Sequence, residues 1–334
     1  MNVAVIGAGY WGPNLLRNLY ETHLCERIVC CDLQDKNLKK MKSRYPTIEV
    51  EPNYKNVLAD DRIDAVVIAT PVSTHFPLGL EALTAGKHAF IEKPFTSSRR
   101  DAEKLIELAD NDKRVLMVGH TFEYSPPVLK IKELIDKGEL GKIFYISSSR
   151  VNLGLHQKDI SVIWDLAPHD FSILFHWLDE EPVRISAMGR DYVQKNIPDV
   201  AFINLEFPSG CVAHIQVSWL APSKLRRTAI IGSDKMLVYD DTENIEKVKI
   251  YDKGVDYKDP ETFGEYQLSY RAGDVLSPRL ETFEPLNYEM KHFLDCCQNG
   301  KTPQTDGRNG LRVVKALEAA EKSLRNHSQV VEIA

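Results

Sequence analysis

A lysine in the first half of the chain is a candidate for hydrogen bonding to an alcohol. Glu92-Lys93-Pro94 follows a short apolar run, and a lysine at such a position can donate to a substrate hydroxyl. Pro94 narrows the backbone conformations open to Lys93, because the residue before a proline disfavours the helical region. Lys93 could equally be an ordinary surface lysine of a loop. Its interpretation as a site residue depends on whether the preceding run is a strand that ends at a ligand-binding edge.

A histidine in the second half is a candidate for proton transfer. Asp165 and His169 are four residues apart, so both side chains share one face if their segment is helical. His169 would then accept the proton of an alcohol, since imidazole titrates near neutral pH, and Asp165 would orient its ring. The alternative is that Asp165 caps the helix and His169 is an interior histidine with its hydrogen bonds satisfied. Pro168 is expected in the first helical turn, where a missing N–H is tolerated.

Three glycines near the N-terminus have the spacing of a dinucleotide-binding loop. Gly7, Gly9 and Gly12 follow the apolar run Asn2–Ile6 and precede a helix-like segment. In this motif the first glycine permits a tight turn, the second lets the backbone approach a pyrophosphate, and the third allows close packing of helix and strand. Asp32 ends the next apolar run about 20 residues later, where a carboxylate is expected to bond the adenosine ribose. The alternative is an ordinary glycine-rich turn followed by an unrelated aspartate.

The residues around Asp32 favour NAD over NADP as the cofactor. A carboxylate repels the 2′-phosphate of NADP, and the nearest cations, Lys36 and Lys39, come too far along the next helix to bind it. Further cofactor contacts are expected at the ends of neighbouring strands. These candidates are Tyr10, Trp11, Thr70, Pro71, His75, Glu92 and Lys93.

Two of the polar segments have a second interpretation. The stretch from Thr70 to His75 could be a plain loop with Ser73 or Thr74 capping the following helix, and that role can coexist with cofactor binding. Three residues at the end of the first expected strand of the second half are candidate substrate contacts: Arg150, Asn152 and His156. They could equally be polar residues of a loop.

Residues 1–120 alternate between apolar runs and helix-like segments, which predicts βα units in a doubly wound parallel sheet. The expected strands are Asn2–Ile6, Arg27–Asp32, Ile48–Val50, Ala65–Ala69, Ala89–Ile91 and Val115–Val118. Ligands bind such sheets at the carboxyl ends of the strands, where the glycine-rich loop, Asp32, Thr70 and Lys93 fall. We therefore expect residues 1–120 to be a Rossmann domain that binds a dinucleotide.

Residues 121–334 are expected to form a second domain for substrate binding and oligomerisation. Strands here follow one another with short turns, which predicts a largely antiparallel sheet. The expected strands are Lys142–Arg150, Val183–Gly189, Val200–Phe207, Cys211–Leu220, Arg226–Gly232, Lys235–Asp240 and Lys247–Tyr251. The expected helices are Pro126–Lys137, Asp165–Leu178, Asn287–Gln298 and Gly310–Arg325. Residues 252–284 show no clear period and are expected to be a long irregular excursion.

Composition narrows the classes of protein. The chain is 43% hydrophobic and 27% charged, and no apolar run is long enough to cross a bilayer, so no membrane partner is expected. The first strand begins within two residues of the N-terminus, which leaves no room for a signal peptide and predicts a cytoplasmic protein. A net charge of −6 without a basic block argues against nucleic acid as a partner. The six cysteines include no C-x-x-C pair, and no metal site is expected.

Taken together, these segments resemble the glucose–fructose oxidoreductase/inositol dehydrogenase/MocA family of NAD(P)-dependent sugar dehydrogenases. The segments that carry the resemblance are Gly7–Gly12, Ala69–Pro71 with His75, Glu92–Pro94, Gly138–Lys142, Asp165 with His169, and Asn299–Gly307. The resemblance implies that Lys93 contacts the reacting hydroxyl and the nicotinamide ribose, and that His169 acts as acid and base with support from Asp165. It also implies an open-faced antiparallel sheet, with helices on one side, that forms a homodimer or homotetramer interface.

Two departures from the family pattern stand out. Glu123 occupies a position where many members have an arginine, which changes the charge near the cofactor. The segment before Asp165 also lacks the glycines that usually precede this aspartate, so its loop is expected to differ.

The runs Gly119–Pro126, Arg150–Leu155 and Trp164–His169 look like those of members associated with nucleotide-sugar metabolism. This resemblance implies a UDP-linked amino sugar as substrate, in surface-glycan biosynthesis, and adds Tyr124 and Trp164 to the candidate substrate contacts. One alternative is a free-sugar or myo-inositol dehydrogenase. A second alternative is an NAD(H)-binding sensor without turnover, against which stands the coexistence of Lys93, Asp165 and His169.

Overall fold

The computed structural model describes residues 1–154, 160–258 and 267–333, and the chain forms two compact units. Unit 1 comprises Met1–Ser125 and Phe283–Lys315, and unit 2 comprises Pro126–Thr282 and Ala316–Ala334. The division expected from the sequence assigned everything after residue 120 to one second domain. In the structure, Phe283–Lys315 packs instead with the N-terminal unit.

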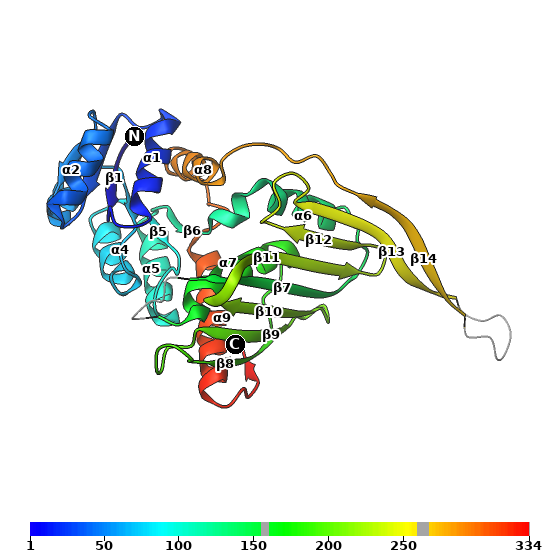
Figure 1. The fold of residues 1–334 in the computed structure, drawn as a ribbon. Helices are drawn as coiled ribbons and strands as arrows, with labels where there is room; N and C mark the ends of the chain where they lie inside the picture. The colour runs from blue at the N-terminus through cyan, green and yellow to red at the C-terminus, as the bar shows by residue number, and fades with distance from the viewer. Residues whose placement is uncertain (155–159, 259–266, 334) are drawn as a thin grey trace. The chain divides into compact units, whose positions relative to one another are not determined.

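Unit 1 is built on a six-stranded parallel sheet with the strand order β3-β2-β1-β4-β5-β6 (Figure 1). Its strands are β1 (Asn2–Ile6), β2 (Arg27–Cys31), β3 (Glu49–Glu51), β4 (Ala65–Ile68), β5 (His88–Glu92) and β6 (Leu116–Gly119). Its helices are α1 (Gly12–Thr22), α2 (Asp35–Arg44), α3 (Tyr54–Ala59), α4 (His75–Thr84), α5 (Arg99–Asn111) and α8 (Pro285–Asn299), with 3₁₀ turns η1 (Val72–Thr74) and η2 (Thr121–Tyr124). This order is that of a doubly wound dinucleotide-binding sheet, so the predicted Rossmann domain is confirmed.

The returning segment completes the core of unit 1. Leu15 and Leu19 of α1 belong to the same buried cluster as Met290 and Phe293 of α8. The ring of Phe293 also meets that of Phe90 edge to face, with 5.6 Å between their centroids. Each such buried side chain contributes about 1.5–3 kcal/mol of hydrophobic stabilisation, so this unit depends on residues from near the end of the chain.

The returning segment also holds the end of β6. The N–H of Val118 donates to the carbonyl of Thr305 at 2.8 Å, and the hydroxyl of Thr305 donates to the carbonyl of Val118 at 2.8 Å. The hydroxyl of Tyr124 lies 3.0 Å from that of Thr305. These contacts fix the loop that follows β6 at the ligand-binding edge of the sheet.

Unit 2 is built on a nine-stranded mixed sheet with the order β14-β13-β12-β11-β7-β10-β9-β8-β15 (Figure 1). Its strands are β7 (Ile143–Leu153), β8 (Arg184–Arg190), β9 (Val200–Glu206), β10 (Val212–Ser218), β11 (Leu220–Gly232), β12 (Met236–Asp240), β13 (Val248–Lys258), β14 (Gln267–Leu276) and β15 (Val331–Glu332). Its helices are α6 (Pro126–Asp136), α7 (Val162–Leu178) and the C-terminal part of α9 (Gly307–Arg325). All described pairs are antiparallel except β7 with β10, so the prediction of a largely antiparallel sheet is confirmed.

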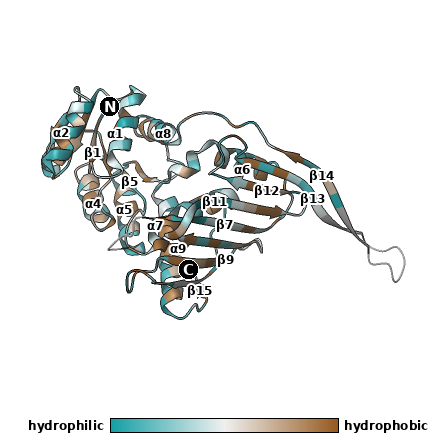
Figure 2. Cartoon of the chain, in the orientation of Figure 1, coloured by the Kyte–Doolittle hydropathy of each residue, from teal (hydrophilic) through white to brown (hydrophobic). Residues whose placement is uncertain are grey.

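The two faces of this sheet differ in burial. Along β8, β9 and β10 every second residue is buried, as in Ile185, Ile203 and Ile215. The hydroxyl of Ser323 on α9 accepts the N–H of Ala187, and α7 packs against β7, β9 and β10. The intervening residues form an outer face on which Met188 is exposed, and Figure 2 shows hydrophobic and hydrophilic residues alternating along these strands. The sheet is therefore open on one side, as the resemblance implied.

The expectation of an irregular excursion over residues 252–284 is wrong for most of its described part. Strand β13 extends to Lys258, and Gln267–Leu276 forms β14, which pairs with it. The sequence predicted only the first part of β13, as Lys247–Tyr251. It missed the continuation of β13 and all of β14, the edge strand of the sheet, where little apolar alternation is needed: Val275 and Leu276 are exposed. Residues 259–266 lie outside the described residues. No helix of the described residues has the length and apolar character needed to cross a bilayer.

Candidate active site

The glycine-rich loop between β1 and α1 is shaped by two of its three glycines. Gly7 has φ +98°, and a Cβ there would lie 2.6 Å from the carbonyl oxygen of Ala69. A Cβ on Gly12 would lie 1.8 Å from the carbonyl oxygen of Gly7. A Cβ on Gly9, by contrast, would meet no protein atom within 4 Å. The packing of the chain therefore does not require glycine at position 9. The open space beside the backbone of Gly9 fits the close approach of a dinucleotide pyrophosphate.

Asp32 follows β2 and organises this loop. Its Oδ2 accepts the backbone N–H of Ala8 at 2.7 Å, and its Oδ1 accepts the N–H of Gln34 at 2.7 Å and the amide of Asn37 at 3.1 Å. The carboxylate therefore joins the end of β2 to the glycine-rich loop. Its remaining lone pairs fit the predicted bond to a ribose hydroxyl, and the exposed Leu33 that follows offers no charge to a 2′-phosphate.

Replacing Asp32 with alanine is expected to weaken NAD binding about 10- to 100-fold, because hydrogen bonds to a charged group contribute about 1.5–3 kcal/mol each. The variant also lacks the carboxylate that repels the 2′-phosphate of NADP, so the affinity for NADP should fall less than the affinity for NAD. The preference for NAD should therefore become smaller. Fluorescence titration of both cofactors measures this. The control is Asp35→Ala, which removes an exposed carboxylate paired with Lys39 on α2; equal losses in the two variants would contradict the assignment.

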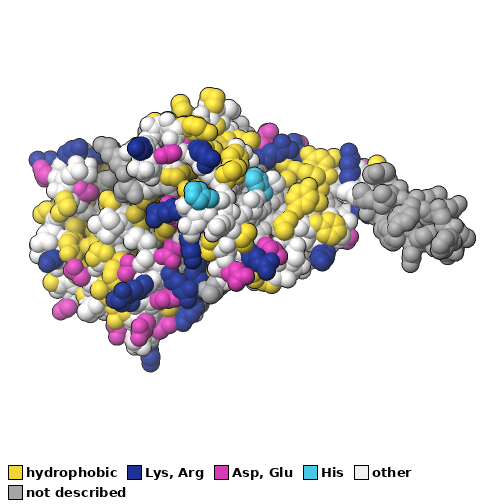
Figure 3. All heavy atoms as spheres, turned by 90° about the horizontal axis from the view of Figure 1, so that it is seen from below, with side chains coloured by type: hydrophobic (Ala, Val, Ile, Leu, Met, Phe, Trp, Pro, Cys, Tyr) yellow, Lys and Arg dark blue, Asp and Glu magenta, His cyan; other side chains and the backbone are white. Residues whose placement is uncertain are grey.

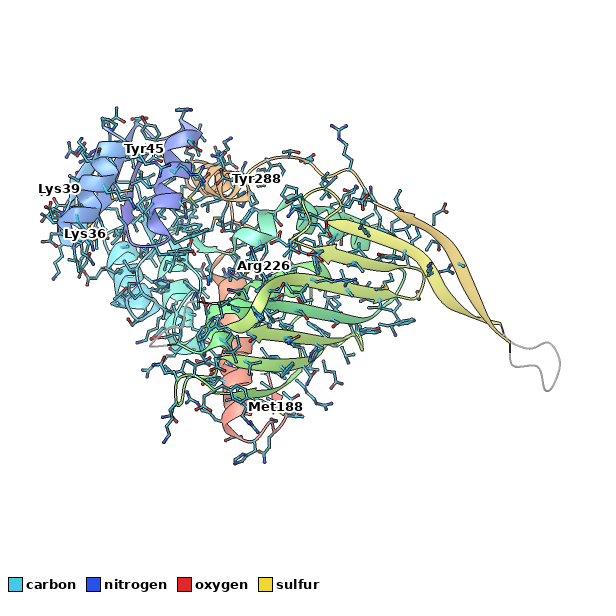
Figure 4. All side chains as sticks on the ribbon, viewed as in Figure 1. Lys36, Lys39, Tyr45, Met188, Arg226 and Tyr288 are labelled. Carbon is cyan, nitrogen blue, oxygen red and sulfur yellow. The ribbon has the colours of Figure 1, made fainter. Side chains whose placement is uncertain are left out.

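The other expected cofactor contacts near this loop differ in exposure. Tyr10 is 88% exposed, while Trp11 is the N-cap residue of α1 and lies near enough to Glu92 to lower the pKa of that carboxyl, against the larger effect of burial. Lys36 and Lys39 lie on α2 (Figure 4), and Lys39 is paired with Asp35 at 2.6 Å. Trp11 therefore links the glycine-rich loop to the end of β5, a contact that the sequence did not predict.

His75 connects two loops at the ends of β4 and β5. Its Nε2 lies 2.8 Å from the carbonyl oxygen of Thr70, and its Nδ1 lies 2.8 Å from that of Pro94. Burial lowers the pKa of His75, and the two carbonyls oppose this. His75 is buried and both of its ring nitrogens are hydrogen-bonded, so it positions these loops; a contact of this segment with the cofactor stays a prediction.

The loop from Thr70 to His75 also differs from its expected cap. The hydroxyl of Thr74 donates to the carbonyl of Pro71 at 2.7 Å and lies 2.7 Å from the hydroxyl of Thr70. Thr74 is the N-cap residue of α4, but its side chain makes no capping bond, and Val72–Thr74 forms a 3₁₀ turn instead. The hydroxyls of this loop thus bond to each other beside the glycine-rich loop.

Lys93 directly follows β5 at the carboxyl edge of the sheet, in the position that the sequence interpretation required. Its backbone N–H donates to Oε2 of Glu92 at 3.1 Å. Burial is the main cause of the lowered pKa of His75 and of His120, and the positive charge of Lys93 lowers both further. The side chain is half-buried, which suits a residue that presents its charge to a ligand.

Asp165 and His169 both lie within α7, so they share a face of that helix. The N-cap residue is Ser161, which excludes the capping role considered for Asp165. Pro168 lies well inside the helix, and its placement in the first turn was therefore wrong. Because proline has no N–H, the carbonyl of Trp164 receives no helical bond from position 168, which loosens the helix beside Asp165.

Trp219 supports Asp165 and was not predicted from the sequence. Its indole N–H donates to Oδ2 of Asp165 at 3.0 Å, and its side chain is 1% exposed. Gly154 accommodates this ring, because a Cβ there would lie 2.4 Å from Cδ1 of Trp219. A glycine just after the strand that carries Arg150 was visible in the sequence, but nothing connected it with a tryptophan 65 residues later.

Arg150 does not occupy the predicted position at a strand end or in a loop. It lies within β7, and its Nε donates to Oδ2 of the buried Asp170 at 2.6 Å. The hydroxyl of Ser148 donates to the other oxygen of Asp170 at 2.7 Å. The structure thus places Arg150 in a buried ion pair between the sheet and α7, and its assignment as a substrate contact stays a prediction.

The remaining predicted substrate contacts fall in different surroundings. Tyr124 is 1% exposed in the core of unit 1, where its hydroxyl lies 3.0 Å from that of Thr305; its contact with a substrate stays a prediction. Trp164 and Asn152 are half-buried, on α7 and near the end of β7 respectively. His156 lies outside the described residues.

Comparison with known proteins identifies both halves of the chain. Residues 1–120 match the oxidoreductase family with an NAD-binding Rossmann fold, and residues 128–238 match the GFO/IDH/MocA C-terminal domain. The scyllo-inositol 2-dehydrogenase (NAD(+)) of Bacillus subtilis is 26% identical over 97% of this chain and 94% of that protein. The UDP-N-acetylglucosamine 3-dehydrogenase of Acidithiobacillus ferrooxidans is 31% identical over 61% of this chain and 62% of that protein.

The solved structure of that UDP-N-acetylglucosamine 3-dehydrogenase superposes on 98% of this chain and 99% of its own, with a TM-score of 0.80 and 25% identity. The strand order of unit 1, the open nine-stranded sheet of unit 2 and the open backbone at Gly9 agree with these matches. The chain therefore belongs to the GFO/IDH/MocA family of NAD-dependent oxidoreductases.

Proposed function

We propose that this protein oxidises a secondary hydroxyl of a UDP-linked amino sugar, with NAD as the cofactor. The observation that carries the proposal is the arrangement on α7, where His169 and a carboxylate held by Trp219 share one helix face. Lys93, at the carboxyl end of β5, is the second polar group of the proposed site. A protein that only senses NAD(H) would need none of these side chains.

The roles of the residues follow from their chemistry. His169 accepts the hydroxyl proton on a ring nitrogen. Lys93 donates a hydrogen bond to the same oxygen as negative charge develops on it, and Asp165 stabilises the imidazolium that forms. Bound NAD supplies the hydride acceptor.

Two relatives support different substrates. The UDP-N-acetylglucosamine 3-dehydrogenase supports a nucleotide sugar through its 31% identity and its similar fold. The scyllo-inositol 2-dehydrogenase supports a cyclitol, because its 26% identity extends over nearly the whole chain. We take the nucleotide sugar as the first candidate and the cyclitol as the second.

The test is the formation of NADH by the purified full chain with UDP-N-acetylglucosamine, free sugars, and scyllo- and myo-inositol. Turnover of the UDP-sugar alone supports the first candidate. Turnover of an inositol alone overturns the substrate and keeps the reaction. NAD binding without hydride exchange with any of these compounds supports the sensor instead.

The outer face of the sheet of unit 2 is proposed as the contact with a second copy of the chain. Tyr145, Met188 and Val212 are exposed on this face, which also holds a hollow of about 610 Å³. Figure 4 labels Met188 on this sheet, and Figure 3 shows one face of the molecule on which hydrophobic patches alternate with charged side chains. Exposed apolar area of this kind is typical of interaction surfaces.

Replacing Met188 with arginine is expected to weaken this assembly, because a charge would be buried without a partner. Sedimentation velocity should show an oligomer for the wild type and a shift toward monomer for the variant. Ile245→Arg is the control, since Ile245 is 88% exposed outside the strands. A wild type that sediments as a monomer at all concentrations would contradict the proposed contact.

A further inference from the structure

Unit 1 contains a group of buried ionisable residues that the proposed reaction does not use. Glu92 ends β5 opposite Gly119 of β6, and a Cβ on Gly119 would lie 3.0 Å from the carboxyl carbon of Glu92. His120 follows Gly119, and the hydroxyl of Thr121 donates to Oε2 of Glu289 on α8 at 2.6 Å. The group therefore lies at the carboxyl ends of β5 and β6, the edge at which doubly wound sheets bind ligands.

Several atoms of this group are buried without hydrogen-bond partners among the described residues. They are Oε1 of Glu92, Oε1 of Glu289 and both ring nitrogens of His120. Glu289 is 0% exposed, His120 1% and Glu92 8%. Buried polar groups are nearly always satisfied, so atoms like these mark a place where water or an exchangeable ligand is bound. In the described part of the chain, no set of three or more His, Cys, Asp or Glu residues is arranged to hold a metal ion.

The charges around the group determine which member exchanges a proton near neutral pH. Burial, followed by the charges of Lys93 and Arg312, lowers the pKa of His120 to about 3, so this ring stays neutral. Burial raises the pKa of Glu289 well above its usual range, and repulsion from Glu92 and Glu123 adds to this, against the hydrogen bond from Thr121. Burial therefore favours the protonated, neutral form of Glu289.

Glu92 is the member that titrates near neutrality. Burial raises its pKa to about 7, against the charge and backbone N–H of Lys93 and a hydrogen bond from Trp11. The last contact matters because Trp11 belongs to the glycine-rich loop and is the N-cap residue of α1. The carboxyl that titrates is thus coupled to the glycine-rich loop, which would hold the cofactor pyrophosphate.

We propose that Glu92 is a proton-exchange site of unit 1, which takes up a proton from solvent when NADH binds and releases it when the cofactor leaves, with Glu289 and His120 as its neutral buried neighbours. The step is the protonation of one carboxylate oxygen and breaks no other bond. This inference rests on NAD as the cofactor of the proposed function, but not on the identity of the substrate.

The direction follows from the charge of the ligand. Bound NADH brings the two negative charges of its diphosphate close to the Trp11 loop, and negative charge favours the protonated carboxyl. NAD⁺ also carries a positive nicotinamide ring, so it should cause less uptake. If bound NADH raises the pKa of Glu92 by one unit, linkage requires NADH to bind about tenfold more tightly below pH 7 than well above it.

The experiment is calorimetric titration of the full chain with NADH and with NAD⁺, in buffers of different ionisation enthalpy, from about pH 6 to about pH 8. The difference between buffers gives the number of protons bound with each ligand. We expect fractional uptake that peaks near pH 7 to 8, is larger for NADH, and accompanies a fall in NADH affinity with rising pH. NADH binding without proton uptake across this range would overturn the proposal, whatever sugar the enzyme turns over.

Two isosteric variants assign the proton. Glu92→Gln should abolish the uptake near pH 7. Glu289→Gln replaces an acid that is already neutral, so uptake should persist; its loss, with cofactor binding retained, would overturn the assignment to Glu92. Glu107→Gln, on the exposed surface of α5 in the same unit, controls for the loss of one carboxylate. If Glu92→Gln fails to fold, infrared spectroscopy decides the same question. NADH binding to the wild type should then produce the band of a protonated carboxyl, and the same band should appear in Glu289→Gln.

Discussion

A His169→Ala protein is expected to bind NAD normally and to oxidise its substrate about 10²- to 10⁴-fold more slowly than wild type, the usual contribution of one general base. His169 lies on the same face of α7 as Asp165, whose carboxylate is held by the indole N–H of Trp219 at 3.0 Å. The variant removes the proposed proton acceptor and leaves the contact between Asp165 and Trp219 in place. Single-turnover formation of NADH measures the loss in the hydride-transfer step.

Two comparisons make this result specific. Added imidazole should restore part of the activity of His169→Ala, because it supplies the missing base to the vacated space. His327→Asn removes an exposed histidine of the same unit at a position with φ +55°, which asparagine tolerates, and should leave turnover unchanged. Full turnover by His169→Ala, with NAD affinity intact, would refute the assignment.

Glu123→Gln is expected to change the pH dependence of the stability of unit 1 strongly. Glu123 is fully buried, and burial raises its pKa to about 8, against hydrogen bonds from Gln304 and Asn309 and the charge of Arg312, with Asp306 raising it further. The folded state therefore keeps a proton that the unfolded state loses above about pH 4.5. Between these two values the free energy of unfolding falls as the pH rises.

The size of this fall follows from the two pKa values. The shift from 4.5 to about 8 corresponds to on the order of 5 kcal/mol, at 1.36 kcal/mol per unit, all of it present at low pH and lost by pH 8. Glutamine is neutral throughout, so the variant should be more stable than wild type near pH 8 by several kcal/mol and similar to it near pH 5. Urea unfolding across this range measures the difference. The control Glu107→Gln should show the same dependence of unfolding free energy on pH as the wild type. If Glu123→Gln also shows the wild-type dependence, Glu123 is not a neutral carboxyl in the folded state.

The architecture could be predicted because local patterns determine it. Short β-branched runs such as Ala65–Ile68 are buried on both faces, and the glycine spacing at Gly7, Gly9 and Gly12 encodes the turn after β1. The second half of β13 and the whole of β14 were missed because β14 is the edge strand of the sheet, and edge strands carry little apolar alternation. The return of Phe283–Lys315 to unit 1 was also missed, since nothing in one sequence shows which surface an amphipathic helix such as α8 covers.

The candidate site shows the same limit at the level of side chains. Residue type and strand ends predicted the positions of Asp32, Lys93 and His169, but not what each side chain bonds. Asp32 proved to hold the glycine-rich loop through Ala8, and His75 proved to join two loops through backbone carbonyls. Backbone atoms are the same at every position, so contacts of this kind leave no trace in a single sequence.

The path of the chain through its two units has a consequence for synthesis. Three junctions, after Ser125, Thr282 and Lys315, carry the chain from one unit to the other. Met290 and Phe293, which complete the buried cluster of unit 1, are translated after nearly all of unit 2. An N-terminal domain usually folds while the ribosome makes the next, but the core of unit 1 can be completed only after most of unit 2 has been translated. Until residues 283–315 leave the ribosome, the first 125 residues expose the hydrophobic surface that this segment covers. A nascent chain stalled before that point is expected to bind chaperones.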